Sequence, residues 1–130
     1  MKVSIVIPTL NEVERLEQAI ARLRLTAGHG AIEIIVADGG SADGTQAAAR
    51  RLADKLAETN RPGRAVQMHQ GALAASGELL LFLHADTRLP GRWLGALLDA
   101  WARKPRPGAT AFRLGFDSTK PVYRLIAALG

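Results

Sequence analysis

The chain has 130 residues, of which 48% are apolar and 22% are charged. Its length is that of one ordinary domain, and its apolar content is sufficient for a packed core, which excludes a disordered chain. Cysteine is absent, so a disulfide framework, a thiolate nucleophile and a cysteine-ligated metal centre are excluded. Absence of cysteine is typical of a reducing compartment, and we predict a cytoplasmic location.

Charge is distributed unevenly along the chain, whose net charge is +5. Residues 1–87 carry nine basic and ten acidic side chains, whereas residues 88–130 carry eight basic and two acidic ones. A basic end can meet nucleic acid, an anionic lipid surface or a phosphorylated substrate, or it can be an ordinary solvated surface. None of the six aromatic residues lies in a basic, aromatic-rich string, so we expect no nucleic-acid partner.

The first apolar segments predict a strand and then a helix. Residues 3–8 are rich in β-branched side chains and predict a strand buried on both faces, which ends at Pro8 because proline lacks an N–H donor. Asn11 is expected to cap the following helix, with Glu14 as its capping-box partner. The helix is expected to end near residues 27–28, where a glycine follows an alanine.

The rest of the chain continues the alternation. The predicted elements are a buried strand over 31–37, a helix over 47–56, a short strand over 65–68, a helix over 70–75, a central strand over 78–84, a helix from about 93 and a strand over 109–116. This pattern predicts an α/β fold with a mostly parallel sheet and right-handed crossovers. No apolar run reaches the ~20 residues that span a bilayer, and the short apolar stretch before Pro8 is too brief for a signal-peptide core.

In an open parallel sheet, ligands bind beyond the carboxyl ends of the strands. Four polar segments directly follow predicted strands, over 8–12, 38–45, 68–71 and 84–88. We therefore search these segments for the residues that carry the chemistry.

Two of these segments contain candidate carboxylates. Asp38 opens a glycine-rich turn, where it can accept hydrogen bonds from a ribose or a base, or satisfy backbone donors in an Asx-turn; Asp43 is expected to cap the next helix. His84 and Asp86 would point to the same side of an extended segment. They could share a cation such as Mg²⁺ or Mn²⁺, or Asp86 could simply form a turn.

Several common nucleotide-binding and hydrolytic motifs are missing from the sequence. A dinucleotide-binding fold needs a glycine-rich loop after its first strand, and residues 8–12 contain no glycine. A phosphate-binding P-loop and a Gly-x-Ser-x-Gly elbow are also absent.

Three segments together resemble family 2 glycosyltransferases. Residues 4–12 (SIVIPTLNE) resemble the family's first strand and loop, residues 33–45 (EIIVADGGSADGT) its second-strand signature, and residues 77–87 (GELLLFLHADT) its metal-binding loop. The motifs occur in the family's order within roughly residues 3–90. The variant is similar to a bacterial glycosyltransferase-like subgroup with poorly defined acceptors.

The resemblance implies a GT-A fold, a nucleotide-diphospho-sugar donor, with a UDP type favoured, and a divalent cation (Mg²⁺ or Mn²⁺). The residues it implies for donor binding are Pro8, Thr9, Glu12, Asp38, Ser41, Gln67, Gln70 and Asp86. Asp86 would ligate the metal with His84, which replaces the first carboxylate of the family's Asp-x-Asp motif. Imidazole adds no negative charge, so the metal would bind more weakly or Asp86 would act alone.

The resemblance also implies that an acceptor-binding half, with an acidic general base, follows the metal loop. Beyond Asp86 only Asp99 and Asp117 are acidic, and neither has the expected context, so no catalytic base is assigned. We expect one family-2-like domain over 1–130, with a donor portion over 1–90 and the start of an acceptor portion over 91–130 that ends early. The basic end suits a phosphorylated or lipid-linked acceptor, at a membrane surface.

The expected function is metal-assisted transfer of a sugar from the nucleotide donor to an unidentified acceptor, with inversion if the reaction is a single displacement. Two alternatives stay open. One is a non-catalytic nucleotide- or sugar-binding module, which could pair with another chain or with a second copy. The other is a nucleotidyltransferase or another phosphate-handling α/β enzyme.

Overall fold

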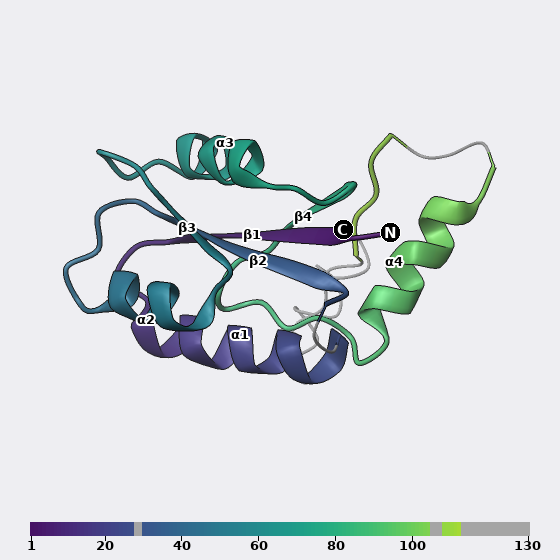
Figure 1. The fold of residues 1–130 in the computed structure, drawn as a ribbon, viewed down its shortest axis with the longest axis horizontal. Coiled ribbons are helices and arrows are strands. Elements are labelled where there is room, and N and C mark those ends of the chain that lie inside the picture. The colour runs from purple at the N-terminus through teal and green to yellow at the C-terminus, as the bar shows by residue number, and fades with distance from the viewer. Residues whose placement is uncertain (28–29, 105–107, 113–130) are drawn as a thin grey trace, which may run out of the picture. The chain divides into compact units, whose positions relative to one another are not determined.

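A parallel sheet in the order β3-β2-β1-β4 forms the centre of the described chain (Figure 1). Its strands are β1 (Val3–Thr9), β2 (Ile32–Asp38), β3 (Lys55–Glu58) and β4 (Leu79–Phe82). This computed structural model describes residues 1–27, 30–104 and 108–112. Every residue of β1 and β2 is buried, as expected of central strands covered on both faces. The predicted α/β class with a parallel sheet is confirmed.

The described helices are α1 (Val13–Ala27), α2 (Thr45–Leu52), α3 (Arg64–Ala74) and α4 (Trp93–Ala102). The first three cover the two faces of the sheet. Figure 1 shows α1 and α2 on one face and α3 on the other. The chain forms two compact units that meet after Trp93 in the sequence. The sheet with α1 to α3 belongs to the first unit, and the chain from Leu94 belongs to the second.

The path of the chain creates a switch point in the sheet. From β1 the chain passes through α1 to β2 and through α2 to β3 on one face, and then returns over the other face through α3 to β4. The strand order therefore reverses between β1 and β4, and ligands of open α/β sheets bind in the crevice at such a point.

Close packing of α3 against β1 depends on a glycine. A Cβ atom at Gly71 would overlap the Cγ1 atom of Val6. Val6, Ile35 and Ala37 form the core beneath this helix. The approach fixes α3 against the sheet, with Gln67 in its first half at the carboxyl ends of β1 and β2.

The first strand continues through the proline that was expected to end it. β1 runs to Thr9, and Pro8 pairs in register with Ala37 of β2. The Val6 carbonyl accepts a hydrogen bond from Leu83 N (3.0 Å), so the Val6 peptide faces β4. Pro8, two residues later, faces the same side beyond the last β4 pairing, where a missing N–H leaves no ladder bond unmade.

Two further elements differ from the prediction. The helix expected over 47–56 ends at Leu52, and Leu56 lies in β3 instead. The strand expected over 65–68 is the start of α3, which buries Gln67 and Gly71 on one helical face. Short apolar runs do not distinguish a strand from a helix, and β3 is a partly exposed edge strand without β-branched residues.

The fourth strand is shorter than predicted and, among the described strands, lies at the edge of the sheet rather than at its centre. Leu80 and Phe82 are 46% and 43% exposed, because α3 covers β1, β2 and β3 but not this strand. The helix predicted from residue 93 is confirmed. Of the strand predicted over 109–116, residues 109–112 are not in a strand, and the remainder lies outside the described residues.

None of the described helices is long and apolar enough to cross a membrane.

Candidate functional site

The carboxyl ends of the two central strands bring Thr9 and Asp38 together. Thr9 pairs with Asp38 in register, and Thr9 Oγ1 donates to Asp38 Oδ1 (2.8 Å). The fully buried Asp38 carboxylate accepts four more hydrogen bonds, from Ser41 Oγ (2.6 Å), Ser41 N (2.8 Å), Gly40 N (3.1 Å) and Gln46 Nε2 (2.9 Å). A carboxylate has about four acceptor sites, so these five hydrogen bonds leave none of them open. The Asx-type network is thus present, and a contact between Asp38 and a base stays a prediction.

Asp38 is held in its ionised form. Burial alone would raise the pKa of its carboxyl group, but the hydrogen bonds from Ser41, Gln46 and Thr9 outweigh burial and lower that pKa below its ordinary value. The result is a fixed negative charge at the switch-point edge of the sheet, shielded by five donors.

Asn11 joins the loop after β1 to the loop after β2. It has a left-handed backbone, with φ of 51°, and its N–H donates to Ser41 Oγ (2.8 Å). Its side-chain Oδ1 accepts a hydrogen bond from Ala42 N (2.8 Å). The prediction that Asn11 caps α1 in a capping box with Glu14 is therefore wrong, because that oxygen serves the neighbouring loop.

Asp43 caps two helices at once. Its carboxylate accepts hydrogen bonds from Val13 N (3.3 Å), at the start of α1, and from Thr45 N (3.0 Å), at the start of α2. Thr45 Oγ1 also donates to Asp43 and accepts from Glu12 N (3.1 Å). Hydrogen bonds from Thr45 and Val13 lower the pKa of Asp43. The predicted capping of the second helix is confirmed, and the capping of α1 is an addition.

Gln67 braces three elements from a buried position. Its Nε2 donates to Thr9 O and Ala37 O, both at 2.8 Å, and its Oε1 accepts from Gly63 N (3.0 Å). A Cβ atom at Gly39 would lie 2.8 Å from that oxygen, so the first glycine after Asp38 leaves room for the brace. The Gln67 amide is fully used by the chain, and its predicted contact with a nucleotide stays a prediction.

The predicted metal loop follows β4 on the other side of the switch point. His84 and Asp86 lie in a turn closed by a hydrogen bond from Thr87 N to His84 O (3.0 Å), not in the extended segment that was expected. The Asp86 side chain is exposed, and the one hydrogen bond that it accepts from the described residues, from Thr87 Oγ1, is long at 3.4 Å. The described residues contain no group of three ligands suited to a metal ion.

A single free carboxylate still suits one class of metal site. Mg²⁺ in nucleotide sites is commonly held by one or two carboxylates together with substrate phosphates. The exposed oxygens of Asp86 fit a cation shared with a diphosphate in this way. They do not form a cage for a cation held by protein ligands alone.

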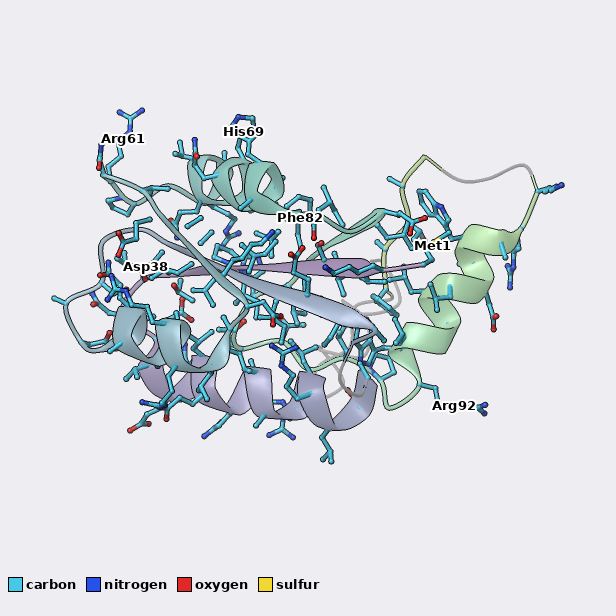
Figure 2. All side chains as sticks on the ribbon, in the orientation of Figure 1. Met1, Asp38, Arg61, His69, Phe82 and Arg92 are labelled. Carbon is cyan, nitrogen blue, oxygen red and sulfur yellow. The ribbon has the colours of Figure 1, made fainter. Side chains whose placement is uncertain are left out.

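Two hollows are lined by residues that follow β1 and β3, and neither is lined by Thr9 or Asp38 themselves. One, of about 370 Å³, lies between the end of β3 and the start of α3 and is lined in part by Asn60, Arg61 and Gln70. The other, of about 240 Å³, is lined in part by Asn11 and Glu12. Figure 2 shows Asp38 and Arg61 at the same end of the sheet. The predicted residues Glu12 and Gln70 thus line separate hollows.

Asn60 and Arg61 were not predicted from the sequence. They follow β3, which was mistaken for the end of a helix. Had a strand been expected over 55–58, the rule that ligands lie beyond strand ends would have selected residues 59–63.

Comparison with known proteins then identifies the family. The sequence profile of the family described as "Glycosyl transferase family 2" matches residues 4–127. A dolichol-phosphate mannosyltransferase of Pyrococcus furiosus is 32% identical over 105 residues, covering 77% of this chain and 30% of that protein. An uncharacterized glycosyltransferase of Mycobacterium tuberculosis is 36% identical over 92 residues, covering 68% of this chain and 35% of that protein.

Solved structures agree with these relatives. A mannosyltransferase of Pyrobaculum calidifontis in complex with GDP-Man and Mn²⁺ has a TM-score of 0.68 and 28% identity, covering 80% of this chain and 33% of that one. Glucosyl-3-phosphoglycerate synthase of M. tuberculosis, in complex with Mn²⁺, UDP and glucosyl-3-phosphoglycerate, has a TM-score of 0.56 and 27% identity, covering 65% of this chain and 33% of that one. The predicted GT-A fold is confirmed.

The matches cover most of this chain but only part of each relative. The chain spans about a third of the length of the relatives and structures that it matches. The family profile covers nearly all of the chain, from the first strand through the region beyond α4. The chain therefore belongs to glycosyl transferase family 2.

Proposed function

We propose that this chain provides the donor-binding part of a glycosyltransferase that uses a nucleotide-diphospho-sugar and a divalent cation. The observation that carries the proposal is the arrangement at the switch point. The Thr9–Asp38 pair and the two hollows lie at the ends of β1, β2 and β3, and the free carboxylate of Asp86 follows β4. The similar structures include complexes with GDP-Man or UDP and Mn²⁺, which supports the same ligand class here.

Each part of the pocket would have a separate task. The braced ends of β1 and β2, with Ser41 and Asn11 joining their loops, form a pre-organised wall for the nucleoside. Gln70 and Arg61 supply donors in the larger hollow beside it. Asp86 would hold the cation, which when bound would neutralise charge on the departing nucleoside diphosphate.

In the proposed reaction the acceptor oxygen forms a bond to the anomeric carbon while the bond from that carbon to the diphosphate oxygen breaks. The electron pair of the broken bond leaves with the diphosphate. A single displacement of this kind inverts the configuration. The acceptor proton needs a base, and the one described carboxylate beyond Asp86 is the exposed Asp99 in α4, to which we assign no such role. Asp117 lies outside the described residues.

The nucleobase and the acceptor are separate parts of the proposal. A UDP-type donor was favoured from the sequence resemblance, whereas similar structures include both GDP-Man and UDP complexes. The basic composition after residue 87 suits a phosphorylated or lipid-linked acceptor, in the cytoplasm and at a membrane surface.

A non-catalytic nucleotide-binding module is the second candidate. The lack of an assigned general base favours it, because such a base commonly contributes about 10²–10⁴ to a rate. Release of UDP or GDP from UDP-glucose or GDP-mannose, measured with Mn²⁺ present, distinguishes the two. Release above the no-protein rate supports the enzyme. Donor binding without release supports the module, and neither binding nor release contradicts both.

A further inference from the structure

The second half of α1 and the segment between Asp86 and α4 contribute a surface of arginine and leucine side chains. A cavity of about 90 Å³ is lined in part by Arg22, Leu25 and Leu89, with Trp93 among its other residues. Exposed arginines, Arg88 and Arg92, stand next to Leu89 and Trp93 in the chain. We call Arg22, Leu25, Arg88, Leu89 and Arg92 the arginine–leucine patch.

The apolar part of the patch is unusually open. Leu25 is 86% exposed, the highest value among the exposed large apolar side chains of the described residues. It stands at the rim of a cavity whose other lining residues include the buried Leu23 and Leu83. A lone exposed leucine needs no explanation, but one beside an apolar hollow offers a surface on which another apolar group can lie.

The charged part of the patch lacks internal compensation. None of the three patch arginines forms a salt bridge with a described carboxylate. The acidic residues of α1, Glu14 and Glu17, lie in its first half. In the segment from Leu83 to Trp93, Asp86 is the only acidic residue. The patch is therefore a local excess of positive charge around apolar side chains.

A role in stabilising α1 does not explain this charge. A cation near a helix carboxyl end is favourable, but the basic residue in the last turn of α1 is Arg24, which is not part of the patch. Arg24 is in addition paired with Asp54 (2.9 Å). Arg88 and Arg92 belong to no helix, and Figure 2 shows the Arg92 side chain pointing outward from the surface. Their charge remains available to a partner.

We propose that the arginine–leucine patch docks the protein on an anionic membrane surface. Peripheral binding combines the burial of apolar side chains at the headgroup boundary with the attraction of Lys and Arg to anionic lipids. Leu25 and Leu89 provide the first contribution, and the three arginines provide the second. The proposal assigns to named residues the membrane location that is part of the proposed function, and none of these residues has been assigned to the nucleotide pocket.

The test measures partition of the 130-residue chain onto sonicated vesicles by co-sedimentation. One vesicle contains phosphatidylcholine alone, and the other contains phosphatidylcholine with 30% phosphatidylglycerol. We expect binding to the anionic vesicle only, and weaker binding as salt is raised. Each arginine near an anionic surface contributes about fivefold in partition, so Arg22→Ala, Arg88→Ala and Arg92→Ala together should lower it by roughly a hundredfold at low salt.

A matched variant controls for net charge. Arg15, Arg61 and Arg64 are also exposed and have no salt bridge to the described carboxylates, so changing these three to alanine removes the same charge elsewhere. This control should lose much less partition than the patch variant. Leu25→Ser should reduce partition at physiological salt, while circular dichroism shows the native spectrum for all variants.

Three results would overturn the proposal: no binding to anionic vesicles, equal losses in the patch and control variants, or unchanged partition in Leu25→Ser. Equal losses would indicate attraction by net charge alone. Calorimetric titration of the unaltered chain and of the patch variant with UDP or GDP and Mn²⁺ keeps the two proposals separate. If the unaltered chain binds no nucleotide, the proposed function is contradicted. The vesicle result then still decides whether the patch docks on the membrane.

Discussion

The Asn11 side chain accepts a hydrogen bond from Ala42 N, and the Asn11 N–H donates to Ser41 Oγ, both at 2.8 Å. This reciprocal pair joins the loops after β1 and β2, whose ends carry the buried Thr9–Asp38 pair. Both loops then lead directly into helices capped by Asp43. The nucleotide pocket that we propose is thus assembled by hydrogen bonds between loops, in addition to the packing of the strands.

The first prediction concerns Asn11. Glycine tolerates the left-handed backbone, whereas alanine does not, so Asn11→Gly removes the side-chain bond alone and Asn11→Ala adds backbone strain. We expect Asn11→Gly to lower the free energy of unfolding by about 1 kcal/mol and Asn11→Ala by about 2 kcal/mol. Urea denaturation measures both values. Equal stability of Asn11→Ala and the unaltered chain would contradict the role of this residue.

The second prediction separates two glutamines of α3. Gln67 is buried and uses its whole amide within the chain, whereas Gln70 is exposed and lines the larger hollow. Gln67→Ala should cost about 2–4 kcal/mol of stability, because it removes three hydrogen bonds between this side chain and the backbone. Gln70→Ala should leave stability within about 0.5 kcal/mol and weaken nucleotide binding. Thermal denaturation and calorimetry provide the two readouts, and the reverse pattern would show that these roles are exchanged.

The third prediction tests the contact between α3 and β1. Gly71→Ala places a Cβ on Val6 and should destabilise the chain by about 1–3 kcal/mol. Gly95 of α4 is a matched control, because a Cβ there has no neighbour within 4 Å in the part of the chain that the structure describes. Gly95→Ala should be neutral or stabilising by up to about 1 kcal/mol, since alanine favours a helix. If both variants unfold at the same denaturant concentration, the close approach of α3 is not what requires glycine.

The fourth prediction concerns acid stability and Glu33, at the amino end of β2. This buried carboxylate accepts hydrogen bonds from Ser4 Oγ (2.6 Å) and Ser76 (2.8 and 2.9 Å) and pairs with Lys55 (2.8 Å). Burial alone would raise the pKa of Glu33, but Lys55, Ser4 and Ser76 outweigh it and hold that pKa far below its ordinary range. The stability it contributes is therefore present above the unfolded-state pKa, near 4.3, and is lost progressively as the pH falls below that value.

Glu33→Gln should remove this pH dependence. We expect the variant to be less stable than the unaltered chain by about 1–3 kcal/mol at pH 7, with the difference shrinking between about pH 4.5 and pH 2.5. Denaturant titrations over this pH series measure the difference. A difference that stays constant with pH would show that the Glu33 charge does not stabilise the fold.

Much of the fold followed from the sequence because its central strands are unambiguous. β1 and β2 are rich in β-branched residues and buried on both faces, and the turn residues after Asp38 mark the carboxyl edge where the site lies. The edge strand β3 gave no such signal, since its four residues are partly exposed and short. Its misplacement hid Asn60 and Arg61, which depend on where that strand ends.

The site residues divide in a similar way. Thr9, Asp38 and Ser41 were expected together and do meet, because parallel register fixes the ends of adjacent strands. The brace made by Gln67 and the double cap made by Asp43 could not be predicted from local patterns. Each joins groups about 30 to 58 residues apart in the chain, and only the packed fold brings those groups within hydrogen-bonding distance.

The measurement that most directly tests the central claim is calorimetric titration of the chain with UDP and with GDP, in the presence and absence of Mn²⁺. We predict binding of at least one of these nucleotides that is tightened by Mn²⁺, and a loss of about tenfold or more of that tightening in Asp86→Asn. Asp99→Asn, an exposed carboxylate in α4, serves as the control and should bind as the unaltered chain does. Absence of binding to either nucleotide, or Mn²⁺ dependence that survives in Asp86→Asn, would contradict the account.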